Sequence, residues 1–166
     1  MPSASGLGPG QRLRARERAT QAGMLGYENR AKIHYSQKPN RWEGIKNRLN
    51  ARRGKFPRNA DCSSFVSWCL FNGLELGFST GDVVNGSGWT GGYTGTMRSN
   101  GLRVEHVGNL LRGDCVHYGE GVTAHVTMVV GRRAGVPMVV SHGSEGGPYY
   151  TNYDYRSDIK EFRRYI

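Results

Sequence analysis

The segment from residue 61 to residue 73 constrains the fold of this chain more than any other part of its sequence. Asp61 is a favoured N-cap residue, and it stands directly before a run of apolar side chains with helical spacing. The apolar positions lie three, four, seven and eight residues after Cys62: Phe65, Val66, Cys69 and Leu70. This pattern predicts a helix of about three turns that buries one face and ends near Asn72–Gly73. Cys62 then lies in the first turn of a buried helix.

The three cysteines of the chain are predicted to be free thiols. An odd number cannot pair completely, and no Cys-x-x-Cys spacing indicates a zinc ribbon. A helix N-terminus favours the thiolate, which is the nucleophilic form, so Cys62 is the candidate nucleophile. Cys69 and Cys115 fall inside apolar elements and fit the simpler interpretation of small buried residues. That interpretation fits Cys62 poorly because of its place at the helix start.

The chain after the predicted helix is rich in strand and turn signals. The apolar runs Val122–Val130 and Pro137–Ser141 predict two strands joined by a tight connection at Arg132–Gly135. Residues 81–101 hold seven glycines without a regular period, and we expect a long loop there. Residues 61–166 therefore predict an α+β core.

The first part of the chain is strongly basic. Residues 1–60 hold 14 Lys and Arg against 3 Asp and Glu, whereas residues 61–166 hold 9 against 10. Gln11–Gly23 is predicted to be helical, and Met24–Tyr35 to be a second helix or a continuation. A basic segment of this kind binds nucleic acid, anionic lipid or an acidic wall polymer, or is a solvated helical surface. We expect residues 1–60 to pack as a basic helical lead-in on the core, within a single domain.

Two histidines are candidates for a general base. If the two apolar runs form an antiparallel hairpin centred on Arg133–Ala134, His125 and His142 face each other across the strand pair. One ring could then hydrogen-bond the other and fix its orientation, as the third member of a catalytic triad does. A slip of one residue in this register would move the side chains to opposite faces. The other interpretation is two histidines in one sheet by chance.

Three motifs in the order of a known family support this site. Asp61-Cys62-Ser63-Ser64-Phe65 resembles the DCSGF-type nucleophile segment of the NlpC family of papain-like cell-wall peptidases. Arg112-Gly113-Asp114 and His125-Val126 resemble the turn and the base segment of that family, and His142 falls where its third polar residue lies. The resemblance covers residues 61–142, and the sequences of 141–148 and 155–166 are similar to a phage-encoded branch. Ser64 and Thr127 depart from the family pattern, which has Gly at both positions.

The resemblance implies a papain-like α+β fold and a cysteine hydrolase acting on the peptide stem of bacterial peptidoglycan. Cys62 would attack the amide carbonyl, His125 would transfer the proton, and His142 would orient His125. Some further residues are candidates for contacting the substrate: Asp61, Ser63, Tyr35, Trp89 and Tyr93. For Asp61 and Ser63 the alternative role is helix capping, and for the two loop aromatics it is a mobile loop. No metal or organic cofactor is expected, since the sequence offers no ligand cluster.

Partners, location and alternative functions follow from the same residues. Met1–Gly10 lacks the apolar segment of a secretory signal, and no apolar run is long enough to span a bilayer. We therefore expect synthesis in the cytoplasm of an infected host, followed by action on the cell wall or packaging in a virion. An acidic wall polymer is the expected partner of the basic residues, with nucleic acid less favoured and no membrane partner. The alternatives are a catalytically silent wall-binding or virion module, and an amidase or transacylase acting on another amide or ester.

Overall fold

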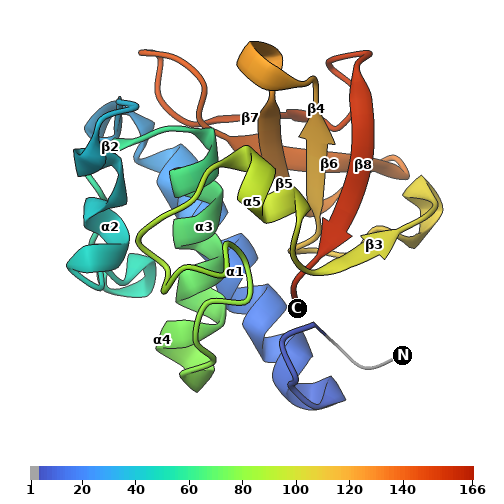
Figure 1. Ribbon diagram of the computed structural model, residues 1–166, viewed down its shortest axis with the longest axis horizontal. Coiled ribbons are helices and arrows are strands. Elements are labelled where there is room, and N and C mark those ends of the chain that lie inside the picture. Colours follow the sequence, from blue (N-terminus) through green and yellow to red (C-terminus); the bar gives the residue numbers. More distant parts are fainter. Residues whose placement is uncertain (1–3) are drawn as a thin grey trace.

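The computed structural model describes residues 4–166 and has helices on one side and an antiparallel sheet on the other (Figure 1). Residues 1–3 of the predicted lead-in lie outside the described part. Five α-helices are present in the described residues: α1 (Pro9–Glu28), α2 (Glu43–Lys46), α3 (Cys62–Gly73), α4 (Glu75–Phe78) and α5 (Thr94–Arg98). Within residues 4–166, no helix combines the length and apolar character needed to cross a membrane.

Helix α3 begins and ends where the sequence predicts. The Asp61 carboxylate accepts hydrogen bonds from the backbone N–H of Ser64 at 2.9 Å and from its hydroxyl at 2.8 Å. The Ser64 hydroxyl in turn accepts from the Asp61 N–H at 2.9 Å, which completes a capping box. All helix residues after Cys62 are buried. The N-cap and the apolar spacing together therefore define this helix.

Helix α1 joins the core through small side chains. It is one continuous helix from Pro9 to Glu28. The residues that follow form a 3₁₀ turn (Arg30–Lys32) and the short strand β1 (His34–Tyr35). Met24–Glu28 therefore continues the first helix, and no second helix is formed over Met24–Tyr35. Its buried residues are Ala15, Ala19, Thr20, Ala22, Gly23 and Gly26. A methyl group at Gly26 would lie 2.8 Å from the Phe65 ring. The helix therefore needs few large apolar residues, because its backbone approaches its neighbours closely.

The six-stranded sheet is antiparallel throughout, in the order β3-β8-β4-β5-β6-β7. Its strands are β3 (Leu102–Val104), β4 (Cys115–Tyr118), β5 (His125–Arg133), β6 (Val136–Ser141), β7 (Tyr149–Asn152) and β8 (Ile159–Arg164). The two strands predicted around residues 122–141 correspond to β5 and β6. A separate two-stranded parallel pair joins β1 to β2 (Asn59–Ala60).

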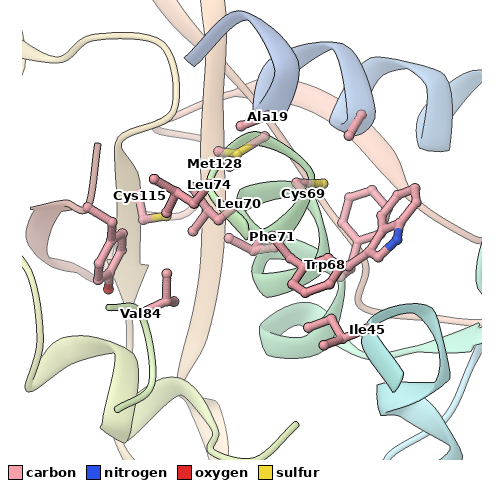
Figure 2. Packing of buried hydrophobic residues seen from close by; sticks show 14 of the residues in the cluster. Ala19, Ile45, Trp68, Cys69, Leu70, Phe71, Leu74, Val84, Cys115 and Met128 are labelled. Carbon is pink, nitrogen blue, oxygen red and sulfur yellow. The ribbon is translucent and has the colours of Figure 1, made fainter. Parts of the chain in front are cut away.

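The main core lies between the sheet and helices α1 and α3. Figure 2 shows Trp68 and Leu70 of α3 and Leu74, which directly follows this helix, in this cluster, with Cys115 and Met128 contributed by the sheet. Side chains that alternate with these along the strands, such as Val116 and Val129, form a second and smaller cluster on the other face. One sheet thus supports two apolar layers.

The predicted register of the β5–β6 hairpin is wrong by one residue. Met128 pairs with Val140, whereas a hairpin centred on Arg133–Ala134 would pair it with Val139. The turn is Ala134–Gly135, where both residues have positive φ (49° and 81°), as in the tight turns that suit the twist of a hairpin. This moves the centre of the hairpin one residue later, which shifts the partner of each β5 residue by two positions next to the turn. An irregularity between Val129 and Gly131 shifts the pairing back by one, so that the net error beyond it is one residue.

The glycine-rich segment 81–101 is more ordered than a plain loop. The Asp82 carboxylate accepts hydrogen bonds from four backbone N–H groups, those of Val84, Asn85, Ser87 and Trp89. Helix α5 follows, and Met97 from this helix is fully buried. The expectation of a long irregular loop therefore holds only for the residues before α5. In these residues polar side chains, not a hydrophobic period, organise the backbone.

We expect Gly73→Ala to destabilise the protein by about 1–3 kcal/mol, as overpacking does in a tight core. A methyl group at Gly73 would lie 2.3 Å from the Ala15 carbonyl oxygen, so α1 and α3 would have to separate. Gly77→Ala is the matched control, because its methyl group would only touch the flexible Arg18 side chain at 3.4 Å. Urea unfolding of both variants tests this, and equal midpoints would contradict the close helix crossing.

We expect buried His117 to make the protein sensitive to acid. Among residues 4–166, neither ring nitrogen of His117 has a hydrogen-bond partner, and burial lowers the pKa of His117 from 6.5 to about 3. The unfolded chain therefore binds more protons below pH 6.5, and stability falls by up to about 1.4 kcal/mol per pH unit as the pH decreases toward 3. His117→Leu should remove this contribution and unfold at higher urea at pH 4.5 than the wild type. The same loss of stability between pH 7 and 4.5 in both proteins would show that another group is responsible.

Candidate active site

Cys62 is the first residue of α3, and its thiol is half-buried at the helix start. It lines a cavity of about 320 Å³ together with Asp61, Ser63, Tyr93 and Ala124, among others. Burial first, and then the Asp61 carboxylate, raise the pKa of Cys62 to about 12. Backbone groups of Ser63, in the first turn of α3, and of Val126, in β5, lower this pKa. Burial outweighs them, so the thiol is neutral at pH 7.

His125 is the first residue of β5 and is surrounded by aromatic rings. Its Nε2 atom is hydrogen-bonded to the Tyr149 hydroxyl at 2.5 Å, and the two rings are nearly parallel, at 14°. The Tyr118 ring lies 6.0 Å away on the neighbouring strand. Burial, followed by the positive charge of Arg156, lowers the pKa of His125 to about 4. The imidazole is therefore neutral at pH 7.

The two candidate catalytic groups meet at the start of β5. The backbone of Val126, which directly follows His125, lies near enough to the Cys62 thiol to lower its pKa. Ala124 lines the cavity of the thiol, and His125 lines a second cavity of about 390 Å³ with Tyr149 and Tyr155. Among residues 4–166, no hydrogen bond joins the thiol to the His125 ring. Such bonds often form only when the substrate is bound.

His142 is not in contact with His125 in the way that the sequence predicts. Its Nε2 atom is hydrogen-bonded to the carbonyl oxygen of Ile33 at 3.0 Å, and its Nδ1 atom is buried without a partner. The ring packs edge-on against Tyr35 and Phe65, on the side of the sheet that α3 covers. The one-residue shift of the hairpin register is the reason, since the predicted pairing placed His125 opposite His142.

Tyr149 and Tyr155 are the residues at this site that sequence reasoning missed. The Tyr149 hydroxyl contacts both Nε2 of His125 and the Tyr155 hydroxyl, the latter at 2.6 Å. Tyr149 reaches the site because β7 pairs with β6 and places it beside Ser141. The only sequence signal is a tyrosine pair after the loop 143–148, and without the order of the strands it could not be assigned to His125.

The predicted substrate residues are not all at the site. Asp61 and Ser63 line the thiol cavity while their side chains are hydrogen-bonded to each other at 3.2 Å in the helix cap. Tyr35 lies close by, since its pKa is raised first by burial and then by the neighbouring Cys62 and Asp61. The expectation for Trp89 is wrong, because it is only 4% exposed and packs on Phe71. Tyr93 is 61% exposed and lines the thiol cavity.

The remaining cysteines are structural in character. Cys69 and Cys115 are completely buried, and burial raises the pKa of each thiol well above its usual range. Within residues 4–166, no group of three or more His, Cys, Asp or Glu side chains is arranged to hold a metal ion. The chemistry available at the site is therefore that of one accessible thiol, one neutral imidazole and the tyrosine hydroxyls.

Comparison with known proteins identifies the fold. The sequence matches no protein-family model and no curated protein. The structure is similar to that of NlpC2 from Trichomonas vaginalis, with a TM-score of 0.57 and 17% identity over 92% of this chain and 47% of that one. It is also similar to NlpC1 from the same organism, with a TM-score of 0.55 and 16% identity over 89% of this chain and 44% of that one. The chain thus spans less than half the length of these structures. It has an NlpC-like, papain-like α+β fold.

Proposed function

We propose that this chain is a cysteine hydrolase that cleaves an amide bond in the peptide stem of bacterial peptidoglycan. The observation that carries the proposal is the placement of the Cys62 thiol at the capped start of α3, against the backbone that follows His125. The NlpC-like fold supports a papain-like cysteine hydrolase. Cell-wall peptide as the substrate rests on the likeness of segments 61–65, 112–114 and 125–126 to the motifs of cell-wall peptidases.

The proposed reaction begins from a neutral thiol and a neutral imidazole. His125 takes the proton of the Cys62 thiol as the sulfur attacks the carbonyl carbon, and then gives this proton to the leaving amine. The resulting thioester is hydrolysed when His125 takes a proton from water, which releases the carboxylate and restores the thiol. The backbone N–H of Cys62, at the helix start, is the proposed donor to the oxyanion. Asp61 and Ser63 are proposed to hold the substrate backbone from the rim of the thiol cavity.

We expect Cys62→Ala to abolish the release of peptide fragments from purified peptidoglycan, because no other accessible thiol lines the cavity. Cys69→Ala is the matched control and should retain cleavage, since Cys69 is fully buried in α3. The rate should also fall as the pH decreases through about 4, where protonated His125 can no longer accept a proton. Mass spectrometry of the released fragments identifies the bond that is cut. Equal cleavage by Cys62→Ala and the wild type would refute the proposal.

An acidic wall polymer is the proposed partner of the basic residues that precede the site. Four cationic or titratable side chains line a cavity of about 450 Å³: Lys32, His34, Lys55 and Arg58. No carboxylate is among its lining residues. The nearby Glu43 is occupied by the backbone N–H groups of Arg58 and Asn59. Two aromatic rings are in the lining, the exposed His34 imidazole and the half-buried Phe56 ring, beside the three cationic side chains that offer anion contacts.

We expect Lys55→Gln combined with Arg58→Gln to weaken binding to a polyol phosphate polymer and to reduce the salt dependence. Each lost phosphate contact lowers the slope of log K against log salt by roughly one unit. The control removes two exposed charges elsewhere, at Arg103 and Lys160, which lie beside Glu105 and Glu120. Isothermal titration at several salt concentrations measures both. An equal effect of the two double variants, or tighter binding to single-stranded nucleic acid, would contradict a specific polymer site.

The predicted phage origin, the route to the cell wall and the alternative of a silent virion module stay predictions of the sequence. The peptidoglycan experiment separates the hydrolase from the silent module, because only the hydrolase releases fragments that depend on Cys62.

A further inference from the structure

We propose that Tyr149, supported by Tyr155, is the positioning residue that sets the orientation and tautomer of His125. This inference rests on the proposed function, in which His125 is the general base. It assigns to two tyrosines the role that the sequence predicts for His142. The observation that carries it is the continuous hydrogen-bonded chain from Nε2 of His125 through the Tyr149 hydroxyl to the Tyr155 hydroxyl, with distances of 2.5 Å and 2.6 Å.

The surroundings of His125 allow little freedom to its ring. Tyr149 stacks on it with ring centroids 6.2 Å apart, and Tyr118 lies on the adjacent strand at 6.0 Å. The backbone of Gly143 lies beside another part of the ring, because a methyl group there would lie 3.4 Å from Cε1 of His125. The ring is 9% exposed as a result. A hydrogen bond to Nε2 in such a site selects one rotamer of the ring and one position of its proton.

The proposal includes a direction for these hydrogen bonds, since either tyrosine hydroxyl can donate to the other and the His125 proton can lie on either ring nitrogen. Burial first, and then the hydrogen bond to Tyr155, raises the pKa of Tyr149 above its usual value. Burial raises the pKa of Tyr155 as well, while the bond to Tyr149 lowers it. In the proposed arrangement the Tyr149 hydroxyl donates to the Tyr155 hydroxyl. The Tyr149 oxygen then accepts a hydrogen bond from the Nε2–H group of His125.

This arrangement leaves Nδ1 of His125 as the basic atom. With the ring proton on Nε2, the lone pair on Nδ1 can accept a proton from the thiol or from water. Nδ1 makes no hydrogen bond within residues 4–166. When His125 becomes positively charged during the reaction, Nε2–H still donates to Tyr149. Tyr149 remains a neutral phenol. Like a neutral amide side chain in the same place, it would orient the imidazolium without adding a negative charge.

His142 is held elsewhere by its own hydrogen bond. Its Nε2–H donates to the Ile33 carbonyl, which ties the end of β6 to the segment before β1. Its ring contacts Tyr35 and Phe65 rather than the group around Tyr149. His142 therefore joins two backbone segments, whereas Tyr149 contacts the candidate base.

The test compares Tyr149→Phe, Tyr155→Phe, His142→Ala and His125→Ala in the full chain. The phenylalanine variants keep the ring stacking and remove only a hydroxyl. The first readout is the ¹⁵N NMR signal of the His125 ring, which reports the tautomer directly. The second is the rate of Cys62 alkylation by iodoacetamide between pH 5 and 9, which needs no substrate. The third is kcat and KM for release of peptidoglycan fragments.

We expect Tyr149→Phe to give a mixture of His125 tautomers and to lower kcat by roughly ten- to a hundredfold with little change in KM, as loss of a hydrogen bond to a charged group does. Tyr155→Phe should change the tautomer less, because the contact between Tyr149 and His125 remains. His142→Ala should keep the wild-type tautomer. If Tyr149→Phe fails to fold, Tyr155→Phe decides the question. A partial change of the His125 tautomer in that variant supports the inference, and the wild-type tautomer contradicts it.

Several outcomes would overturn the inference. They are a wild-type tautomer and kcat in Tyr149→Phe, a gain of activity in that variant, or a tautomer change in His142→Ala as large as that in Tyr149→Phe. A gain of activity would mean that Tyr149 holds the ring away from the thiol. Failure of the proposed function has a different signature, since His125→Ala would then leave both Cys62 alkylation and fragment release unchanged.

Discussion

The hydrogen bonds of the Asp61 carboxylate are the interaction on which the candidate site depends. This group ends the segment after β2 and begins α3, because it accepts from the Ser64 N–H and from the hydroxyls of Ser63 and Ser64. Strand β2 pairs with β1 directly before it and brings Tyr35 beside Ala60. The position of the Cys62 thiol is thus determined by one helix cap, and Tyr35 is brought to it by the same strand pair.

The close crossing of α1 and α3 explains how a strongly basic helix forms part of the core. The face that α1 turns inward carries alanine and glycine, and Gly73 of α3 meets the Ala15 backbone without space for a methyl group. Dispersion contacts between closely packed backbones replace the large apolar side chains that a core helix usually supplies. Of the arginines of α1, Arg14 is exposed, whereas Arg16 is half-buried and donates from Nη2 to the Ile166 carbonyl oxygen at 3.0 Å.

Burial, rather than the helix N-terminus, determines the charge state of the site. The backbone groups at the start of α3 and at Val126 lower the pKa of Cys62, yet burial and Asp61 raise it to about 12. Burial among the aromatic rings, followed by the positive charge of Arg156, lowers the pKa of His125 to about 4 and so favours the neutral imidazole. Under the proposed function, the resting pair is therefore neutral, and the thiolate forms only as His125 accepts its proton. Orientation of the imidazole then matters more than a preformed ion pair.

The sequence by itself determined the elements whose signals are local. The N-cap at Asp61 and the apolar spacing after Cys62 define α3, and the two apolar runs predict β5 and β6, because these patterns depend only on neighbouring residues. The tertiary structure decided the partners of His125. The turn at Ala134–Gly135 and the irregularity near Val130 shift the hairpin register, which leaves His142 on Ile33. Pairing of β7 with β6 brings Tyr149 to His125, and the order of strands in a sheet is set by long-range packing that no local pattern encodes. The same packing buried Trp89, for which the sequence alone offered contact with the substrate or a place in a mobile loop.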